Sequence, residues 1–162
     1  MSAHKGKLSR HAERKLAFQV LYGISFTADT TYEDVCAAYQ QSPGNTMEAD
    51  ISDDGNAPDA LPAGFAWDLV LGTWKYRNDI DQIINAHSRK WRVDRMGRIE
   101  VTLLRMAIFE MLYIQNVPCR VTINEALEID KQFGEESASS FVNGILDAVA
   151  KAIESGELKK HD

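Results

Sequence analysis

The segment from residue 99 to residue 114 constrains the fold most strongly, because it is apolar on nearly every side of a helix. It reads IEVTLLRMAIFEMLYI, and its only charged residues are Glu100, Arg105 and Glu110. A helix of this composition has to be buried over most of its surface. Sixteen residues that include three charges are too short and too polar to span a membrane. The segment therefore predicts the central helix of an all-α domain.

Helical periodicity continues through most of the remaining sequence and predicts about seven helices and no convincing strand. Polar side chains that can cap backbone N–H groups mark the expected helix starts. These signals are Ser9, Thr31 with Asp34, Asn78 with Asp81, Asp94, Thr122 with Glu125, and Ser137. Gly134 is expected to be a left-handed residue after a helix, and Gly144 to permit the close approach of a neighbouring helix.

Charged residues are distributed unevenly along a chain whose formal net charge is −6. Residues 1–15 hold five basic residues and one acid, whereas residues 43–62 hold five acids and no base. The acidic segment has almost nothing to bury and predicts a loop. A helical wheel of the first predicted helix places a basic face opposite its apolar side. That face consists of Lys7, Arg10, His11, Arg14 and Lys15.

The basic face stands where a helix dipole favours acids, so it has two interpretations. It is either a surface selected for binding an acidic partner or an ordinary solvated face, as runs of charge usually are. The net negative charge of the whole chain argues against indiscriminate binding to nucleic acids.

The sequence lacks the residue patterns that catalysis or cofactor binding requires. It contains no P-loop, dinucleotide-binding, HExxH or GxSxG motif. Its four histidines are scattered and its two cysteines have no CxxC spacing, so we expect no metal site, no cofactor and no activated nucleophile. Arg105 and Glu110 are expected to form an internal polar network, because an unpaired buried charge is costly. Inert thiols and the lack of an apolar signal segment predict a cytoplasmic protein that is not an enzyme.

Short motifs spread over most of the chain resemble those of the NusB family of bacterial transcription antitermination factors. Arg14, Ala17, Gln19, Leu21 and Tyr22 resemble the Arg-rich opening of that family, and Asp81 resembles a position in its fourth helix. Residues 103–110 are similar to its ILRxAxYE segment, and residues 141–147 to its FVNGxLD segment. Between them lie Val117 and Pro118, residues 123–126, and Lys131, Phe133 and Gly134, which resemble P…INEA…K-x-FG.

The resemblance implies an all-α fold of two helical lobes, here at about 8–90 and 91–156, within a single domain of residues 1–162. It also implies a function without catalysis: binding single-stranded boxA-type RNA together with NusE, a small-subunit ribosomal protein, in read-through transcription of ribosomal RNA operons. RNA polymerase and other Nus factors would be indirect partners. RNA contacts in the family come mainly from the Arg-rich opening, which matches Lys5, Lys7, Arg10, His11, Arg14 and Lys15 here. Tyr22 and Phe141 match nearby aromatic residues, and Glu100 matches an acidic position that faces NusE.

Departures from the family pattern leave an alternative open. His11 and Ala12 interrupt the arginines, Ser140 stands where Lys is frequent, and Asp130 replaces a small residue. The chain could therefore be a helical protein-interaction module with little RNA affinity of its own. A third reading is the helical domain attached to some ribosomal-RNA methyltransferases, although no catalytic domain is expected in this chain. Trp67 and Trp91 could serve either an interface or the core.

Overall fold

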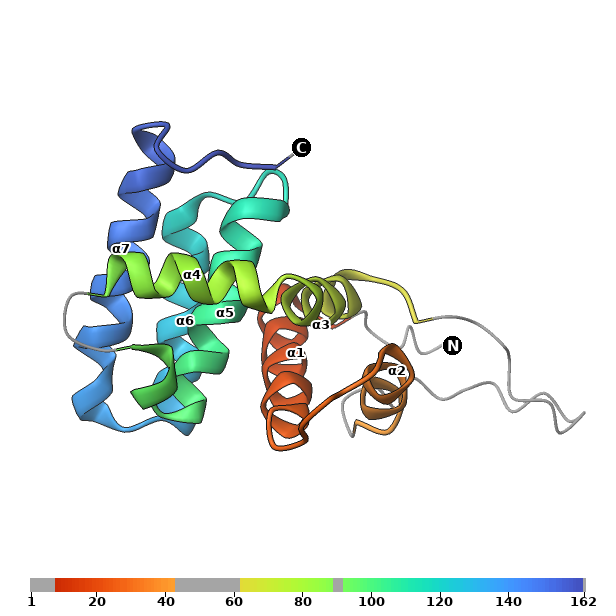
Figure 1. Cartoon of the computed structure of the whole chain (residues 1–162). Coiled ribbons are helices and arrows are strands. Elements are labelled where there is room, and N and C mark those ends of the chain that lie inside the picture. The colour runs from red at the N-terminus through yellow and green to blue at the C-terminus, as the bar shows by residue number, and fades with distance from the viewer. Residues whose placement is uncertain (1–7, 43–61, 89–91, 162) are drawn as a thin grey trace, which may run out of the picture.

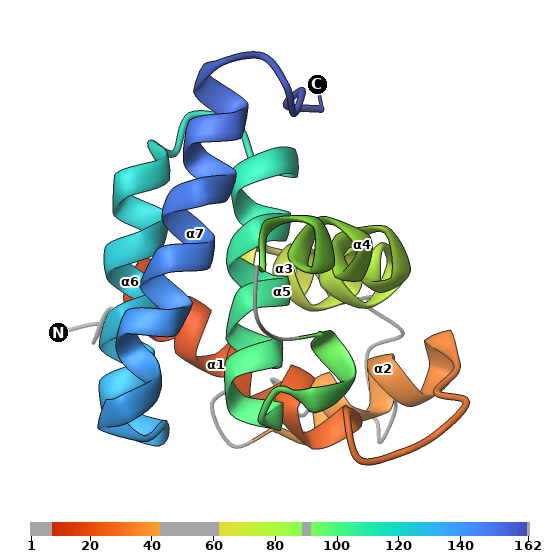
Figure 2. The same ribbon diagram turned by 60° about the vertical axis from the view of Figure 1, so that its left-hand side comes forward.

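Helix α5 (Arg98–Tyr113) lies at the centre of the molecule, as its apolar sequence predicts (Figures 1 and 2). The computed structural model describes residues 8–42, 62–88 and 92–161. Within these ranges there are seven α-helices, two short 3-10 turns and no strand. Every residue from Val101 to Leu112 except Arg105 is buried. The described part of the chain therefore confirms the predicted all-α class and the buried central helix.

Five helices surround α5 directly, and the remaining one, α2, packs on α1 and α3. Figure 1 shows α1, α2 and α3 on one side of the molecule, with α4, α6 and α7 around the other side of α5. The bounds of the surrounding helices are α1 Arg10–Ile24, α2 Tyr32–Gln40, α3 Phe65–Lys75, α4 Arg77–His87, α6 Cys119–Phe133 and α7 Ser139–Glu154. The division into two lobes near residue 90 stays a prediction. The acidic segment at 43–61, Trp91, Lys5 and Lys7 lie outside the described residues.

Two of the predicted helix starts are confirmed by cap hydrogen bonds. The Ser9 hydroxyl accepts a hydrogen bond from the Ala12 backbone at 3.1 Å. Thr31 and Asp34 form a reciprocal capping box at the start of α2, with bonds of 3.2 and 2.9 Å. The bonds from Thr31 lower the pKa of the Asp34 carboxyl below its usual value. These two caps could be predicted from the sequence because the donor and acceptor of each hydrogen bond lie within one helical turn.

We predict that Thr31→Ala lowers the free energy of unfolding by about 1 kcal/mol, because the Asp34 backbone N–H loses its acceptor. Urea unfolding followed by circular dichroism measures this change. Thr31→Ser keeps the hydroxyl and should unfold near the wild-type midpoint. Equal losses in the two variants would contradict a role for the cap.

The other predicted helix starts are wrong. Helix α4 begins at Arg77 after Tyr76, and α5 begins at Arg98, four residues beyond Asp94. Helix α6 begins after Pro118, so that Thr122 and Glu125 lie inside it. Helix α7 begins at Ser139 without a side-chain cap from Ser137. Several of these polar residues serve tertiary contacts instead, since Asp81 binds Arg105, Glu125 binds His11 and Thr122 is buried.

The expectations for Gly134 and Gly144 are also wrong. Gly134 has a φ of −95°, which is not left-handed. Gly144 is exposed, and a Cβ added there would meet nothing within 4 Å. The glycine that permits close packing is Gly72 in α3, where a Cβ would overlap the Phe109 ring of α5. Trp67 is buried at 5% exposure and therefore belongs to the core.

Both charged residues in the middle of α5 are paired, as predicted for an internal polar network. Arg105 donates two hydrogen bonds of 2.7 Å to the carboxylate of Asp81 in α4. Glu110 accepts a hydrogen bond of 2.7 Å from Arg14 in α1. These pairs tie the central helix to α4 and to α1. In the part of the chain that the structure describes, no helix combines the length and apolar character needed to cross a bilayer.

Candidate nucleic-acid interface

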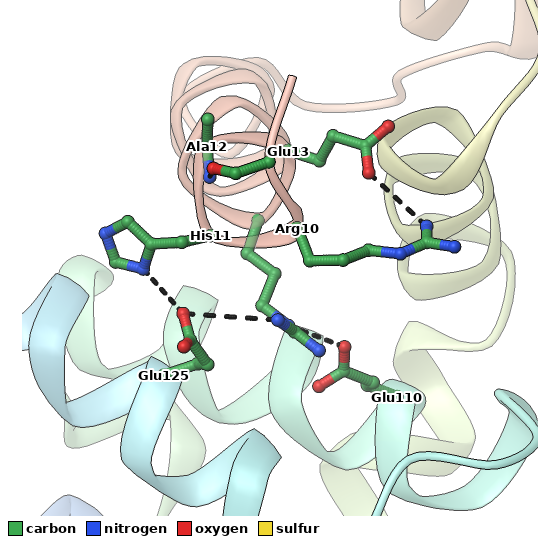
Figure 3. Close-up of polar contacts among 8 residues, drawn as sticks. Arg10, His11, Ala12, Glu13, Glu110 and Glu125 are labelled. Carbon is green, nitrogen blue, oxygen red and sulfur yellow. Dashed lines mark hydrogen bonds and ion pairs between the residues drawn. The ribbon is translucent and has the colours of Figure 1, made fainter. Parts of the chain in front are cut away.

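The N-terminal half of α1 holds the predicted basic residues that fall within the described ranges, and Figure 3 shows two of them with acidic neighbours. This helix packs against α3, α5 and α6 as well as α2. Neighbouring elements therefore cover part of its circumference. The four basic side chains differ in exposure as a result. They are Arg10, His11, Arg14 and Lys15.

Arg10 is the most accessible guanidinium of α1 and lies over an aromatic ring. Its side chain is 61% exposed, and its Nη1 lies 3.3 Å from the Glu13 carboxylate. The guanidinium carbon lies 4.1 Å from the centroid of the Phe65 ring, which is a cation–π geometry. Burial raises the pKa of the Asp68 carboxyl, and the Arg10 charge opposes that rise. Arg10 therefore pairs with Glu13 and lies over the Phe65 ring of α3, and its charge also interacts with that of Asp68.

Arg14 is buried, and its predicted place on the exposed basic face is wrong. Its side chain is 6% exposed, and its Nε donates a 2.7 Å hydrogen bond to Glu110, which is itself 2% exposed. Its Nη1 also lies 4.0 Å from Glu125. A guanidinium enclosed in this way has no open side for an RNA phosphate. The reason is that α5 covers α1 at this turn and supplies the opposite charge.

His11 and Lys15 remain accessible on the same half of α1. The Nδ1 atom of His11 lies 2.5 Å from the Glu125 carboxylate of α6, a contact that Figure 3 shows. Lys15 is partly buried, and its Nζ lies 5.7 Å from the centroid of the Phe133 ring. Together with Arg10 these residues form what we call the α1 basic face (Arg10, His11 and Lys15). Two of its three members lie over aromatic rings.

Tyr22 lies in the C-terminal half of α1. It is seven residues beyond Lys15, the nearest member of the α1 basic face, or about 10 Å along the helix axis. Its ring stacks on Phe18 at 6.0 Å and meets Phe26 edge-on at 5.0 Å. Phe141 lies in the first turn of α7 and is partly buried against the core. Both aromatic residues therefore have packing roles that account for their positions.

Glu100 lies in the first turn of α5 and is partly buried rather than fully exposed. Its carboxylate curls back over Gly97, where an added Cβ would overlap it. A carboxylate near a helix N-terminus is favoured by the dipole, which explains Glu100 without a partner. Its role toward NusE stays a prediction.

Two other features of the site could not be predicted from the sequence. Phe65 and Phe133 supply the rings beneath Arg10 and Lys15, and Glu125 reaches α1 from 114 residues away. Only Glu13, three residues after Arg10, is placed by helical spacing. Among the residues described, no cluster of His, Cys, Asp and Glu could hold a metal ion. The site is therefore a charged surface formed by side chains from α1 and α6, with the buried Phe65 ring of α3 and the partly buried Phe133 ring beneath two of its cations.

Comparison with known protein families identifies relatives of this chain. The model of the NusB family matches residues 11–151, which include His11 and Lys15 of the α1 basic face and every helix from α2 to α6. The chain belongs to the NusB family. A NusB from Nitratidesulfovibrio vulgaris strain DP4, named transcription antitermination protein, is 50% identical over 155 residues, covering 96% of each chain. The Myxococcus xanthus NusB of the same name is 40% identical over 90% of this chain and 96% of its own.

Solved NusB structures share the fold. T. maritima NusB has a TM-score of 0.72 at 29% identity and covers 94% of this chain and 100% of its own. A chain from the crystal structure of antitermination factors NusB and NusE in complex with dsRNA has a TM-score of 0.64 at 24% identity, covering 88% of this chain and 96% of its own. NusB proteins are transcription antitermination factors rather than enzymes, which agrees with the function class predicted from the sequence.

Proposed function

We propose that this chain is an RNA-binding transcription antitermination factor. It binds boxA-type RNA together with NusE and supports read-through transcription of ribosomal RNA operons in the cytoplasm. The name that its NusB relatives carry supports the antitermination role. The NusB–NusE–dsRNA complex makes NusE and RNA the first partners to test. Contacts with RNA polymerase and other Nus factors are indirect in this proposal.

The observation that carries the RNA part of the proposal is the pairing of cations on α1 with aromatic rings of α3 and α6. Arg10 over Phe65 and Lys15 near Phe133 place positive charge on a surface formed by three helices. Phosphates bind such cations, and unstacked bases bind aromatic and polar groups nearby. Lys5 and Lys7 precede this surface in the sequence and add two further candidate phosphate contacts. Arg14 is assigned to the interior and not to RNA.

Four phosphate contacts, from Lys5, Lys7, Arg10 and Lys15, predict a log–log salt slope of about −3 for single-stranded RNA. We expect Arg10→Ala to reduce the slope to about −2, because one contact is lost. Fluorescence anisotropy with labelled boxA-type RNA from 50 to 300 mM salt measures the slope. Lys151→Ala is the matched control, since Lys151 is also an exposed cation paired with an acid, but in α7. A slope unchanged by Arg10→Ala would remove the α1 basic face from the RNA site.

A protein-interaction module with little RNA affinity remains the second candidate, because acids accompany both Arg10 and His11 at this site. Glu13, Asp68 and Glu125 lower the positive potential around Arg10 and His11. Titrating boxA-type RNA with and without NusE distinguishes the two functions. RNA affinity that exists only when NusE is present favours the interaction module.

A further inference from the structure

Glu125 is not the main partner of a buried cation. The buried cation nearest to it, Arg14, already has a full partner, because Glu110 lies 2.7 Å from its Nε and Glu125 lies 4.0 Å from its Nη1. Glu125 is the seventh residue of α6 and is therefore too far from either end to interact with the helix dipole. The acid beside Arg10 differs in this respect, since Glu13 lies in the first turn of α1, where the dipole favours it.

The carboxylate of Glu125 instead turns toward the α1 basic face. It is 26% exposed and lies 2.5 Å from Nδ1 of His11, whose side chain is 47% exposed. Arg10 with Glu13 and Arg14 with Glu110 each form a pair of opposite charges. Glu125 is left facing the imidazole of His11. A carboxylate therefore lies on the surface where the proposed function places RNA phosphates.

We propose that Glu125 is an intramolecular competitor of RNA phosphate at His11. This inference rests on the proposed function and names its regulation. In the free protein the Glu125 carboxylate occupies Nδ1 of His11, the ring nitrogen at which this proposal places a phosphate oxygen. RNA must release this contact and approach an acid, which lowers the sequence-independent part of its affinity. Weak sequence-independent binding makes the complex depend on base contacts and on a second partner, so Glu125 acts as an element of specificity.

The test is the RNA affinity of Glu125→Gln, which removes the charge and retains the shape and hydrogen-bonding capacity of the side chain. We expect a gain of about threefold in affinity at 50 mM salt, the size of one charge removed about 7 Å from a phosphate in water. Screening should reduce the gain as salt increases. BoxA-type and scrambled RNA should gain alike. Asp147→Asn makes the same change of net charge on α7, where Asp147 pairs with Lys151, and should leave the affinity near that of the wild type.

Each outcome decides between the two proposals. Wild-type protein that binds no RNA overturns the proposed function and this inference with it. Wild-type binding with unchanged or lower affinity in Glu125→Gln overturns the inference alone, and lower affinity would show that Glu125 positions His11 for RNA. A second measurement uses the unmodified chain, so it does not depend on the folding of a variant. The ring nitrogen resonances of His11 should shift when boxA-type RNA is added, and unshifted resonances at saturation would contradict release from Glu125.

Discussion

Arg14→Met should lower the free energy of unfolding by about 3–5 kcal/mol, the largest effect that we expect from a charged residue in this chain. The substitution leaves the Glu110 carboxylate, 2% exposed, without the cation that lies 2.7 Å away. A buried charge that loses its partner retains its full desolvation cost. Urea unfolding of the variant and the wild type measures the difference.

A double-mutant cycle separates the ion pair from packing. Combining Arg14→Met with Glu110→Leu removes both charges and should recover most of the lost stability, because apolar replacements of a buried pair are often neutral. Arg10→Met is the matched surface control, since Arg10 is 61% exposed, and its expected change is within about 0.5 kcal/mol. If Arg14→Met unfolded like the wild type and instead weakened RNA binding, Arg14 would be a surface contact and the structural assignment would be wrong.

Gly72→Ala should destabilise the chain by about 2–3 kcal/mol, the upper range for overpacking. The new methyl group would overlap the Phe109 ring. That ring has little room to move, because it packs against both Tyr113 at 5.0 Å and Tyr76 at 6.3 Å. Thermal and urea unfolding provide two independent measurements of the loss.

Gly144→Ala is the matched helical control and should change stability in the opposite direction. Gly144 lies within α7 with nothing near its missing side chain, so alanine should gain about 1 kcal/mol of helix propensity. Losses in both variants, or none in either, would contradict the assignment of Gly72 as the point of close contact between α3 and α5.

The prediction of the core succeeded because burial of α5 follows from composition alone. Twelve consecutive positions, from Val101 to Leu112, include only one residue that is not buried. The sequence indicated that Arg105 and Glu110 would each have a partner of opposite charge, since buried charges need partners. The partners themselves were not predictable. Asp81 and Arg14 each have a plausible local role in the sequence, as a helix cap and as a surface cation, and each joins α5 instead.

The error at Arg14 has a geometric cause. A helical wheel projects all residues along the helix axis, so it places Arg10 and Arg14 on the same face whatever their height along the helix. Exposure changes along that axis, because α5 covers α1 at Arg14 and leaves Arg10 accessible. Cap signals failed for a related reason. Ser9 and Thr31 cap as predicted, whereas Asp81 and Glu125 bind cations from helices that local sequence does not place beside them.

The positions of the cations in the site could therefore be predicted from the sequence, whereas the position of Glu125 could not. Arg10 and Lys15 follow from the position of basic residues on α1. We propose that Glu125 modulates RNA affinity. It reaches that surface because α6 packs beside α1.

The binding of boxA-type RNA and of scrambled RNA of equal length to the wild-type chain with NusE, measured over one salt series, tests the proposed function most directly. We predict tighter binding of boxA-type RNA by at least about tenfold, as expected when base contacts add to phosphate contacts, together with a salt slope of about −3. Equal affinity for the two RNAs, or a slope near zero, would contradict RNA recognition by this surface.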